Sequence, residues 1–279
     1  MRIPLPDLIG PPQRQPRPFD VPVLILGAIA LITLAAPLLN LPDPRTAVAE
    51  AHLRPPSPEH PLGTDALGRD VLSRTLWGGQ QTLLVALLGA GIAILPGLLV
   101  GVLAGYSQGW MDRLLMAGMD ILLAFPNLLL GLAIIALIGP GRLSIALAVG
   151  LAGLPAYARV VRAAVLMVRS APYIDAAHAI GVPPGRILLF HILPNIQESL
   201  FSFAGVSLSW AILNGAALAF LGFGGDPAIP DWGTMLSEGR AVFRLAPWIA
   251  LPPGIAITVT IFAANRLADA WQDTAGHRV

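Results

Sequence analysis

Long apolar runs alternate with shorter polar segments along this 279-residue chain. A helix needs about 20 predominantly apolar residues to cross the roughly 30 Å hydrocarbon core of a bilayer. The fourth of these runs is shorter, but a helical stretch bearing Arg continues it. The pattern therefore predicts an all-α integral membrane protein with six transmembrane helices, over residues 21–41, 82–106, 114–138, 143–157, 196–223 and 248–264.

The polar segments between the runs divide the chain into five parts. Residues 1–20 are rich in Pro and mildly basic, which predicts a disordered tail. The first transmembrane helix (21–41) follows, then an external segment (42–78), the transmembrane core (79–270) and a second short tail (271–279). A cleaved signal peptide is the alternative interpretation of the first run. The further spans and the lack of a clear small-residue cleavage site favour an uncleaved helix.

Composition narrows the function classes. Charged residues make up 12% of the chain, against about 25% in soluble domains. The chain has no Cys, which excludes disulfides, thiol catalysis and Cys-based metal sites, and its net charge of +1 argues against a nucleic-acid partner. All 17 basic residues counted as Lys or Arg are Arg, and a P-loop needs Lys. Any ATPase that drives this protein is therefore a separate polypeptide.

No catalytic or metal site is predicted. The five His lie in loops or tails, and no nucleophile–base pair or metal-ligand cluster stands out. In the third run, Asp120 suggests an ion site by default. Its position within two turns of the start of that run favours an interfacial placement or a helix–helix hydrogen bond.

The external segment contains an amphipathic pattern over residues 60–74. Thr64 or Asp65 could cap a short helix that carries apolar residues on one face. Its other face would carry charges at helical spacing, where they could pair: Asp65, Arg69, Asp70 and Arg74. Spacing alone favours a helix that lies on the surface with solvated charges.

Several spans carry residues that bear on helix packing. Gly97, Gly101 and Gly105 fall four apart, which allows helices to approach closely in lipid. The pair Phe125-Pro126 predicts a kink in the third span. Interfacial anchoring is the simplest role for three Arg that follow the fourth run: Arg159, Arg162 and Arg169. Residues 226–247 are expected to form an external loop or a re-entrant element.

Residues 175–194 differ from the apolar runs on either side. Small residues open this stretch, Gly181 interrupts it, and Pro183-Pro184-Gly185 forces a turn. Apolar residues follow up to Pro194, which is expected to end the segment. The pattern predicts a short helix, a sharp bend and a second short helix. An ordinary polar loop between spans is the alternative.

The spacing in this stretch resembles the EAA loop of ATP-binding-cassette (ABC) importer permeases. The matching elements are Asp-Ala-Ala at 175–177, Gly six residues after its first position, and the closing Leu-Pro at 193–194. Asp175 stands where the family usually has Glu, and His191 where many members have Ile. The resemblance implies a cytoplasmic coupling loop that docks on an ATPase subunit, with these site residues: Asp175, Ala176, Ala177, Gly181, Arg186, His191, Leu193 and Pro194.

A second string narrows the family. Residues 60–74 resemble a signature of the dipeptide, oligopeptide and nickel branch of these permeases, carried here by Gly63, Thr64, Asp65, Gly68, Arg69 and Asp70. The resemblance implies a type I importer permease that forms half of a pore for dipeptides or oligopeptides, with nickel or another small solute as the alternative. A secondary transporter and a non-transporting membrane scaffold are the rival classes.

The resemblance also implies the partners and the location. The expected partners are a homologous second permease in a heterodimer, ATPase subunits that bind ATP-Mg, an extracytoplasmic solute-binding protein, and membrane lipid; this chain is expected to hold no cofactor. The expected location is a bacterial or archaeal cytoplasmic membrane. With six spans, the side of the termini carries ten Arg and the other side seven. The positive-inside rule therefore favours cytoplasmic termini.

Overall fold

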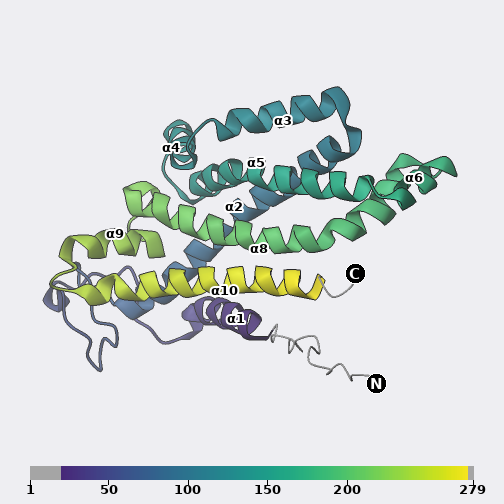
Figure 1. Ribbon diagram of the computed structural model, residues 1–279. Helices are drawn as coiled ribbons and strands as arrows, with labels where there is room; N and C mark the ends of the chain where they lie inside the picture. The colour runs from purple at the N-terminus through teal and green to yellow at the C-terminus, as the bar shows by residue number, and fades with distance from the viewer. Residues whose placement is uncertain (1–19, 276–279) are drawn as a thin grey trace, which may run out of the picture.

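The computed structural model describes residues 20–275, which form helices and no strand. The predicted terminal tails fall mostly outside this range. Figure 1 shows a bundle of long helices with α2 (Val71–Ser107) crossing behind α5 (Arg142–Arg169) and α8 (Leu193–Leu218). The last helix, α10 (Leu251–Ala275), packs on α8, and α1 (Asp20–Leu34) packs on α10 and α2. The prediction of an all-α fold is confirmed.

The centre of the bundle is the contact between α2 and α5. Gly97, Gly101 and Gly105 lie on the face of α2 that packs against α5. A Cβ added at Gly101 would come within 2.5 Å of the Ala158 carbonyl oxygen, so only glycine lets the two backbones approach this closely. Around this contact, α8 adds Ile212 and Leu218 to the buried core.

The third predicted span is broken. It consists of α3 (Gly109–Leu123) and α4 (Asn127–Ile138), which meet at an angle of 86°. Pro126 lies in the break and has no N–H to donate to an upstream carbonyl, and it also disfavours the helical conformation at Phe125. The expected kink is therefore a full break.

Six complete spans were expected, and the described residues supply fewer by length and composition. Four helical segments are long and apolar enough to cross a membrane, or five if the bent pair counts as one span. The first helix has 15 residues, about 22 Å of rise, because it ends before Pro37 and the chain continues as a short 3₁₀ turn at Ala36–Leu38. The last helix, in contrast, extends beyond its predicted end at 264 to Ala275.

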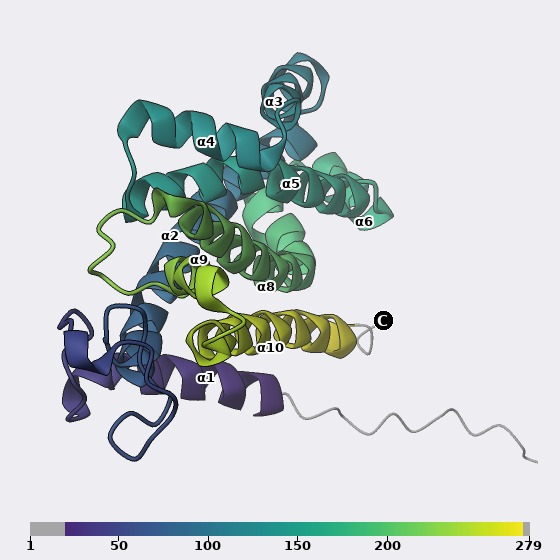
Figure 2. The same ribbon diagram turned by 90° about the vertical axis from the view of Figure 1, so that its left-hand side faces the viewer.

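The two ends of the bundle differ in character. At one end α6 (Pro172–Ala179) projects beyond the other helices, and α10 ends on the same side of the molecule (Figure 1). At the opposite end, residues 36–70 form loops beside α9 (Trp232–Val242), as Figure 2 shows. The chain from α6 to α8 also includes the one-turn helix α7 (Pro184–Ile187).

The α2–α5 contact generates the first prediction. Replacing Gly101 with Leu should lower the thermal stability of the detergent-purified protein by about 1–3 kcal/mol, the usual cost of overpacking. Gly91→Leu is the matched control, because nothing lies within 4 Å of a Cβ at that position on the same helix. Thermal unfolding followed by circular dichroism would measure both variants. Equal melting temperatures for the two would contradict the close-contact account.

Candidate functional site

The projecting end of the molecule is a helix–turn–helix. Its first helix, α6, starts with Pro172 in the first turn, where a missing N–H costs no hydrogen bond. It ends at Ala179, and two residues later the chain turns at Gly181, whose φ of +80° is a conformation that favours glycine. The Val182 N–H donates to the Ala177 carbonyl at 3.1 Å and the Gly181 N–H to the His178 carbonyl at 3.0 Å. This double hydrogen bond is a Schellman motif, which reverses the chain sharply.

The return from the turn is one helical path into the bundle. After α7, residues Leu188–Ile192 form a π turn in which the Leu193 N–H donates to the Leu188 carbonyl. Pro194 was expected to end the segment. It lies instead in the first turn of α8. The wider π turn places Pro194 where its lack of an N–H is tolerated. The helix of the fifth span, α8, therefore begins at Leu193, three residues before the predicted start at 196.

One face of this helix pair is buried and the other is open. Ile174 and Ile187 are fully buried in an apolar cluster with residues of α2 and α5, together with Ile192 at the end of the π turn. The opposite face of α6 is exposed and mixes small side chains with polar and aromatic ones: Tyr173, Asp175, Ala176, His178 and Ala179. A helix pair with a buried apolar base and an exposed outer face is suited to docking on another surface.

The predicted loop residues lie at three places on this element. Asp175, Ala176 and Gly181 are exposed on α6 and its turn, whereas Ala177 faces the buried side. Arg186 is exposed on α7. The half-buried His191 lies in the π turn with Leu193, and its carbonyl accepts a hydrogen bond of 2.6 Å from the Asn195 amide. These residues do not converge on a pocket, and the described part of the chain holds no group of acidic or His residues suited to a metal.

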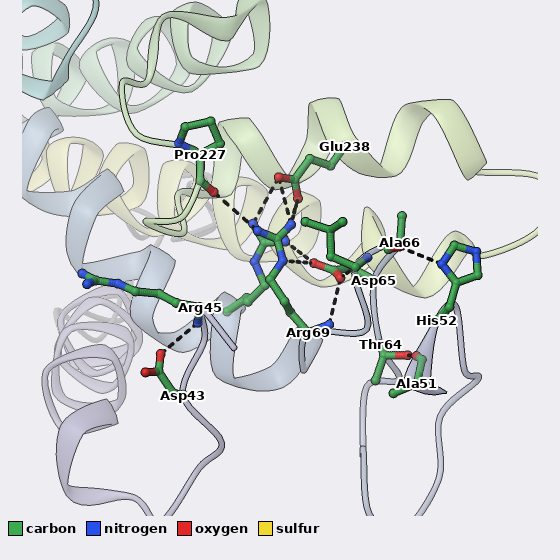
Figure 3. A network of polar contacts seen from close by, with 12 residues as sticks. Asp43, Arg45, Ala51, His52, Thr64, Asp65, Ala66, Arg69, Pro227 and Glu238 are labelled. Atoms are coloured by element: carbon green, nitrogen blue, oxygen red, sulfur yellow. Dashed lines mark hydrogen bonds and ion pairs between the residues drawn. The ribbon is translucent and has the colours of Figure 1, made fainter. Parts of the chain in front are cut away.

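The opposite end of the bundle holds a buried network of charges (Figure 3). Asp65 accepts hydrogen bonds from the Arg69 backbone at 2.9 Å, from the Arg69 guanidinium at 2.7 Å, and from Arg74. Both Arg also contact Glu238 of α9, at 3.1 Å and 2.7 Å. Two positive and two negative charges thus tie the external segment and the start of α2 to α9.

The environment keeps Asp65 ionised. Burial alone raises the pKa of its carboxyl, but the Arg74 charge and the hydrogen bonds from Arg69 outweigh this effect and lower the pKa below 3.8. The side chains of Arg69, Arg74 and Asp65 are each at most 6% exposed. Charges removed from water in this way are tolerated only when each has a partner, so the four residues act as a unit.

These buried pairs correct the expectation of a solvated amphipathic helix. The helix begins at Val71 and is the start of α2, because the cap is Asp70, which accepts the Ser73 N–H at 2.7 Å, and not Thr64 or Asp65. Thr64 and Asp65 instead belong to the folded loops before it, where Gly63 and Gly68 have φ values near +70°. Asp70 also contacts the His60 ring at 2.9 Å.

The structure gives protein partners to the charges near the broken span. Arg159 contacts Asp120 at 2.5 Å, so this Asp makes the helix–helix contact that was favoured over an ion site. Arg162 contacts both carboxylate oxygens of Asp112 at 2.6 Å, and Arg169 donates to the Tyr106 carbonyl. The predicted role of these Arg, interfacial anchoring, is therefore incomplete, because each of them also contacts another helix.

Glu238 is the functional residue that sequence reasoning missed. It is separated from Arg69 by 169 residues, so no local spacing connects them. The available signal was its position in a polar segment at the same predicted membrane face as residues 42–78.

Comparison with known proteins places the chain among transport permeases. Residues 97–279 match the family described as binding-protein-dependent transport system inner membrane component. The chain is 39% identical over 257 residues to the di/tripeptide transport system permease protein DppC of Pseudomonas aeruginosa, covering 90% of this chain and 85% of that one. It is 39% identical over 218 residues to the glutathione transport system permease protein GsiD of Pectobacterium atrosepticum, covering 78% and 72%.

Solved structures share the fold at lower identity. A chain from the inward-facing MetNI methionine ABC transporter superposes with a TM-score of 0.58 at 21% identity, over 72% of this chain and 96% of that chain. A chain from an amino acid ABC transporter gives the same TM-score at 15% identity, over 73% and 94%. The helical core therefore has the fold found in these ABC transporter chains.

The charge network generates the second prediction. Asp65→Asn should leave two buried Arg with one acidic partner and destabilise the external segment by about 3–5 kcal/mol, the cost of breaking a buried pair. Limited proteolysis of the purified protein should then cut within residues 42–70 much faster than in the wild type. Glu59→Gln is the control, because Glu59 lies exposed in the same segment. Equal cleavage rates in both variants would contradict a stabilising role for the network.

Proposed function

The chain belongs to the family of binding-protein-dependent transport system inner membrane components and is a permease of an ABC importer, and we propose that its solute is a dipeptide or other small peptide. The two relatives named for di/tripeptide and glutathione transport support this solute class. Glutathione is itself a small peptide, so both names indicate the same chemistry. Nickel, or another small solute, is the alternative, suggested by the branch that residues 60–74 resemble.

We also propose that a separate ATPase docks on the projecting helix pair α6–α7. Its exposed face carries Ala176 and Ala179 beside Asp175 and His178, and its base is held by the buried Ile174 and Ile187. A separate ATPase that receives this face can move α5 and α8, because both helices continue directly from the loop. Nucleotide binding by that ATPase would thus shift the permease between two conformations.

The division of labour with the partners follows from this arrangement. ATP-Mg is bound and hydrolysed by the ATPase subunits, and this chain contributes no catalytic residue. A homologous second permease completes the pore in a heterodimer. A solute-binding protein delivers the peptide to the other end of the bundle, on the loops of residues 42–70 and around α9.

We infer that the loop lies in the cytoplasm. In Figure 1, α10 ends on the side where α6 projects, and the loops beside α9 lie on the other side. ATP is available in the cytoplasm, so the docking face must be there. The excess of Arg on the side of the termini supports the same orientation.

Uptake into vesicles tests the solute class. The chain would be co-expressed with the second permease, the ATPases and the binding protein encoded beside it, and the complex reconstituted into proteoliposomes. We expect ATP-dependent accumulation of a radiolabelled dipeptide or of glutathione, but not of radiolabelled nickel. Accumulation of nickel alone would replace the peptide proposal. Uptake driven by an ion gradient without ATP would favour a secondary transporter.

The turn of the projecting loop generates a separate prediction. Gly181→Val forces a β-branched residue into positive φ, so the turn should change shape and the ATPase activity of the complex should uncouple from transport. Gly181→Asn is the matched variant, since Asn tolerates this conformation, and it should retain most of the coupling. The measurement is solute transported per ATP hydrolysed, with the amount of protein in the membrane held equal. Normal coupling in Gly181→Val would refute the role of the turn.

A further inference from the structure

The helix α2 is not adjacent to the projecting loop in the sequence, because α3, α4 and α5 lie between them. The loop joins α5 to α8 directly, and a motion of the loop reaches these two helices through the backbone. The helix α2 ends at Ser107, and the chain then turns into α3. A motion of the loop therefore reaches α2 through its packing against α5 and through contacts made at its own end.

Tyr106 supplies the polar contacts at the end of α2. The Tyr106 hydroxyl donates a hydrogen bond to the Pro184 carbonyl at 3.2 Å, at the start of α7. The guanidinium of Arg169, the last residue of α5, donates to the Tyr106 carbonyl and lies 5.5 Å above the centre of its ring. Tyr106 therefore joins the ends of three elements: α2, α5 and α7.

The position of Pro184 determines what the hydrogen bond from Tyr106 holds in place. It belongs to the first residue of α7, which follows the turn at Pro183 and leads into the π turn before α8. A hydrogen bond at this point holds α7 against the end of α2 while α6 remains free to dock. Because Arg169 contacts the same Tyr, the end of α5 and the start of α7 are both held at Tyr106.

We propose that Tyr106 is a positioning residue that makes α2 move with the docking loop, with Arg169 holding its ring and carbonyl in place. This inference rests on the proposed function, because the loop moves only if it docks on an ATPase. The helix α2 spans 37 residues, about 55 Å, and its other end carries Arg74 of the charge network. The link at Tyr106 would thus connect the docking end of the permease to its external end.

The glycine contact with α5 explains why a link at the end of α2 matters. Along Gly97, Gly101 and Gly105 the two helices touch backbone to backbone, so they have little freedom to slide past one another. If the loop pulls α5 while α2 stays behind, this contact must open. Tyr106 keeps this contact closed, because it holds the ends of α2 and α5 to the same loop.

A distance measurement tests the link without requiring the solute to be known. The chain has no Cys, so Ser107→Cys and Leu189→Cys provide two unique sites for spin labels, both exposed. In the assembled complex we expect the distance between the labels to stay the same with and without a non-hydrolysable ATP analogue. In the Tyr106→Phe background, which loses only the hydroxyl, the nucleotide should shift or broaden the distance distribution.

A second readout and a control separate this role from a general effect on folding. Tyr106→Phe should lower solute transported per ATP by about fivefold, the factor that one hydrogen bond represents in an equilibrium. Tyr157→Phe removes a similar hydroxyl contact, with the Leu200 carbonyl at 3.1 Å, which joins α5 to α8 and not α2 to the loop, and should change neither readout. A Tyr106→Phe distance distribution that matches wild type in both nucleotide states would overturn the inference, as would equal effects of the two Tyr variants.

The two proposals fail in different ways. Absence of peptide uptake by the wild-type complex would contradict the proposed solute, while the label distances would still report on Tyr106. Normal peptide uptake with an unchanged label distance in Tyr106→Phe would contradict only the inference about Tyr106.

Discussion

The close approach of α2 and α5 determines the geometry at both ends of this permease. Where the helices cross, a Cβ on Gly101 would overlap the backbone of α5, so the contact exists only because the sequence places glycine there. In lipid, apolar side chains gain little by packing on each other rather than on lipid tails, and close backbone contact is a main source of helix association. The contact aligns two long helices, and their ends then position the loop at one side and the charge network at the other.

The two ends use polar groups in opposite ways. At the external end, four charges are withdrawn from water and joined to each other, which fixes the loops of residues 42–70 to α9. At the projecting end, Asp175 and Arg186 remain exposed, while the apolar base beneath them is fully buried. The first arrangement closes a surface and the second leaves one open for a partner. This contrast agrees with an importer that receives its driving force at one end only.

The sequence predicted the class of fold and the bend of the loop because both depend on local patterns. Apolar runs reveal helices, and Pro183-Pro184-Gly185 with Gly181 reveals a turn. Contacts between residues far apart in the sequence could not be predicted. Nothing near Asp65 indicates a contact with Glu238, so the charges of residues 65–74 were expected to be solvated. The effect of two prolines on helix continuity was also predicted wrongly, because it depends on where in a helix the proline lies. Pro126 breaks a helix, whereas Pro194 is absorbed by the π turn that precedes it.

Docking of the α6 face on an ATPase is the central claim, and site-directed cross-linking tests it most directly. Since the chain has no Cys, Ala179→Cys places a single reactive thiol on the exposed face of α6, and Leu67→Cys places one on the external segment. The assembled complex would be treated with a short thiol-to-amine cross-linker and its products identified by mass spectrometry. We expect Ala179→Cys, and not Leu67→Cys, to cross-link to the ATPase subunit. Cross-linking of the ATPase from Leu67→Cys, or from neither position, would contradict the account.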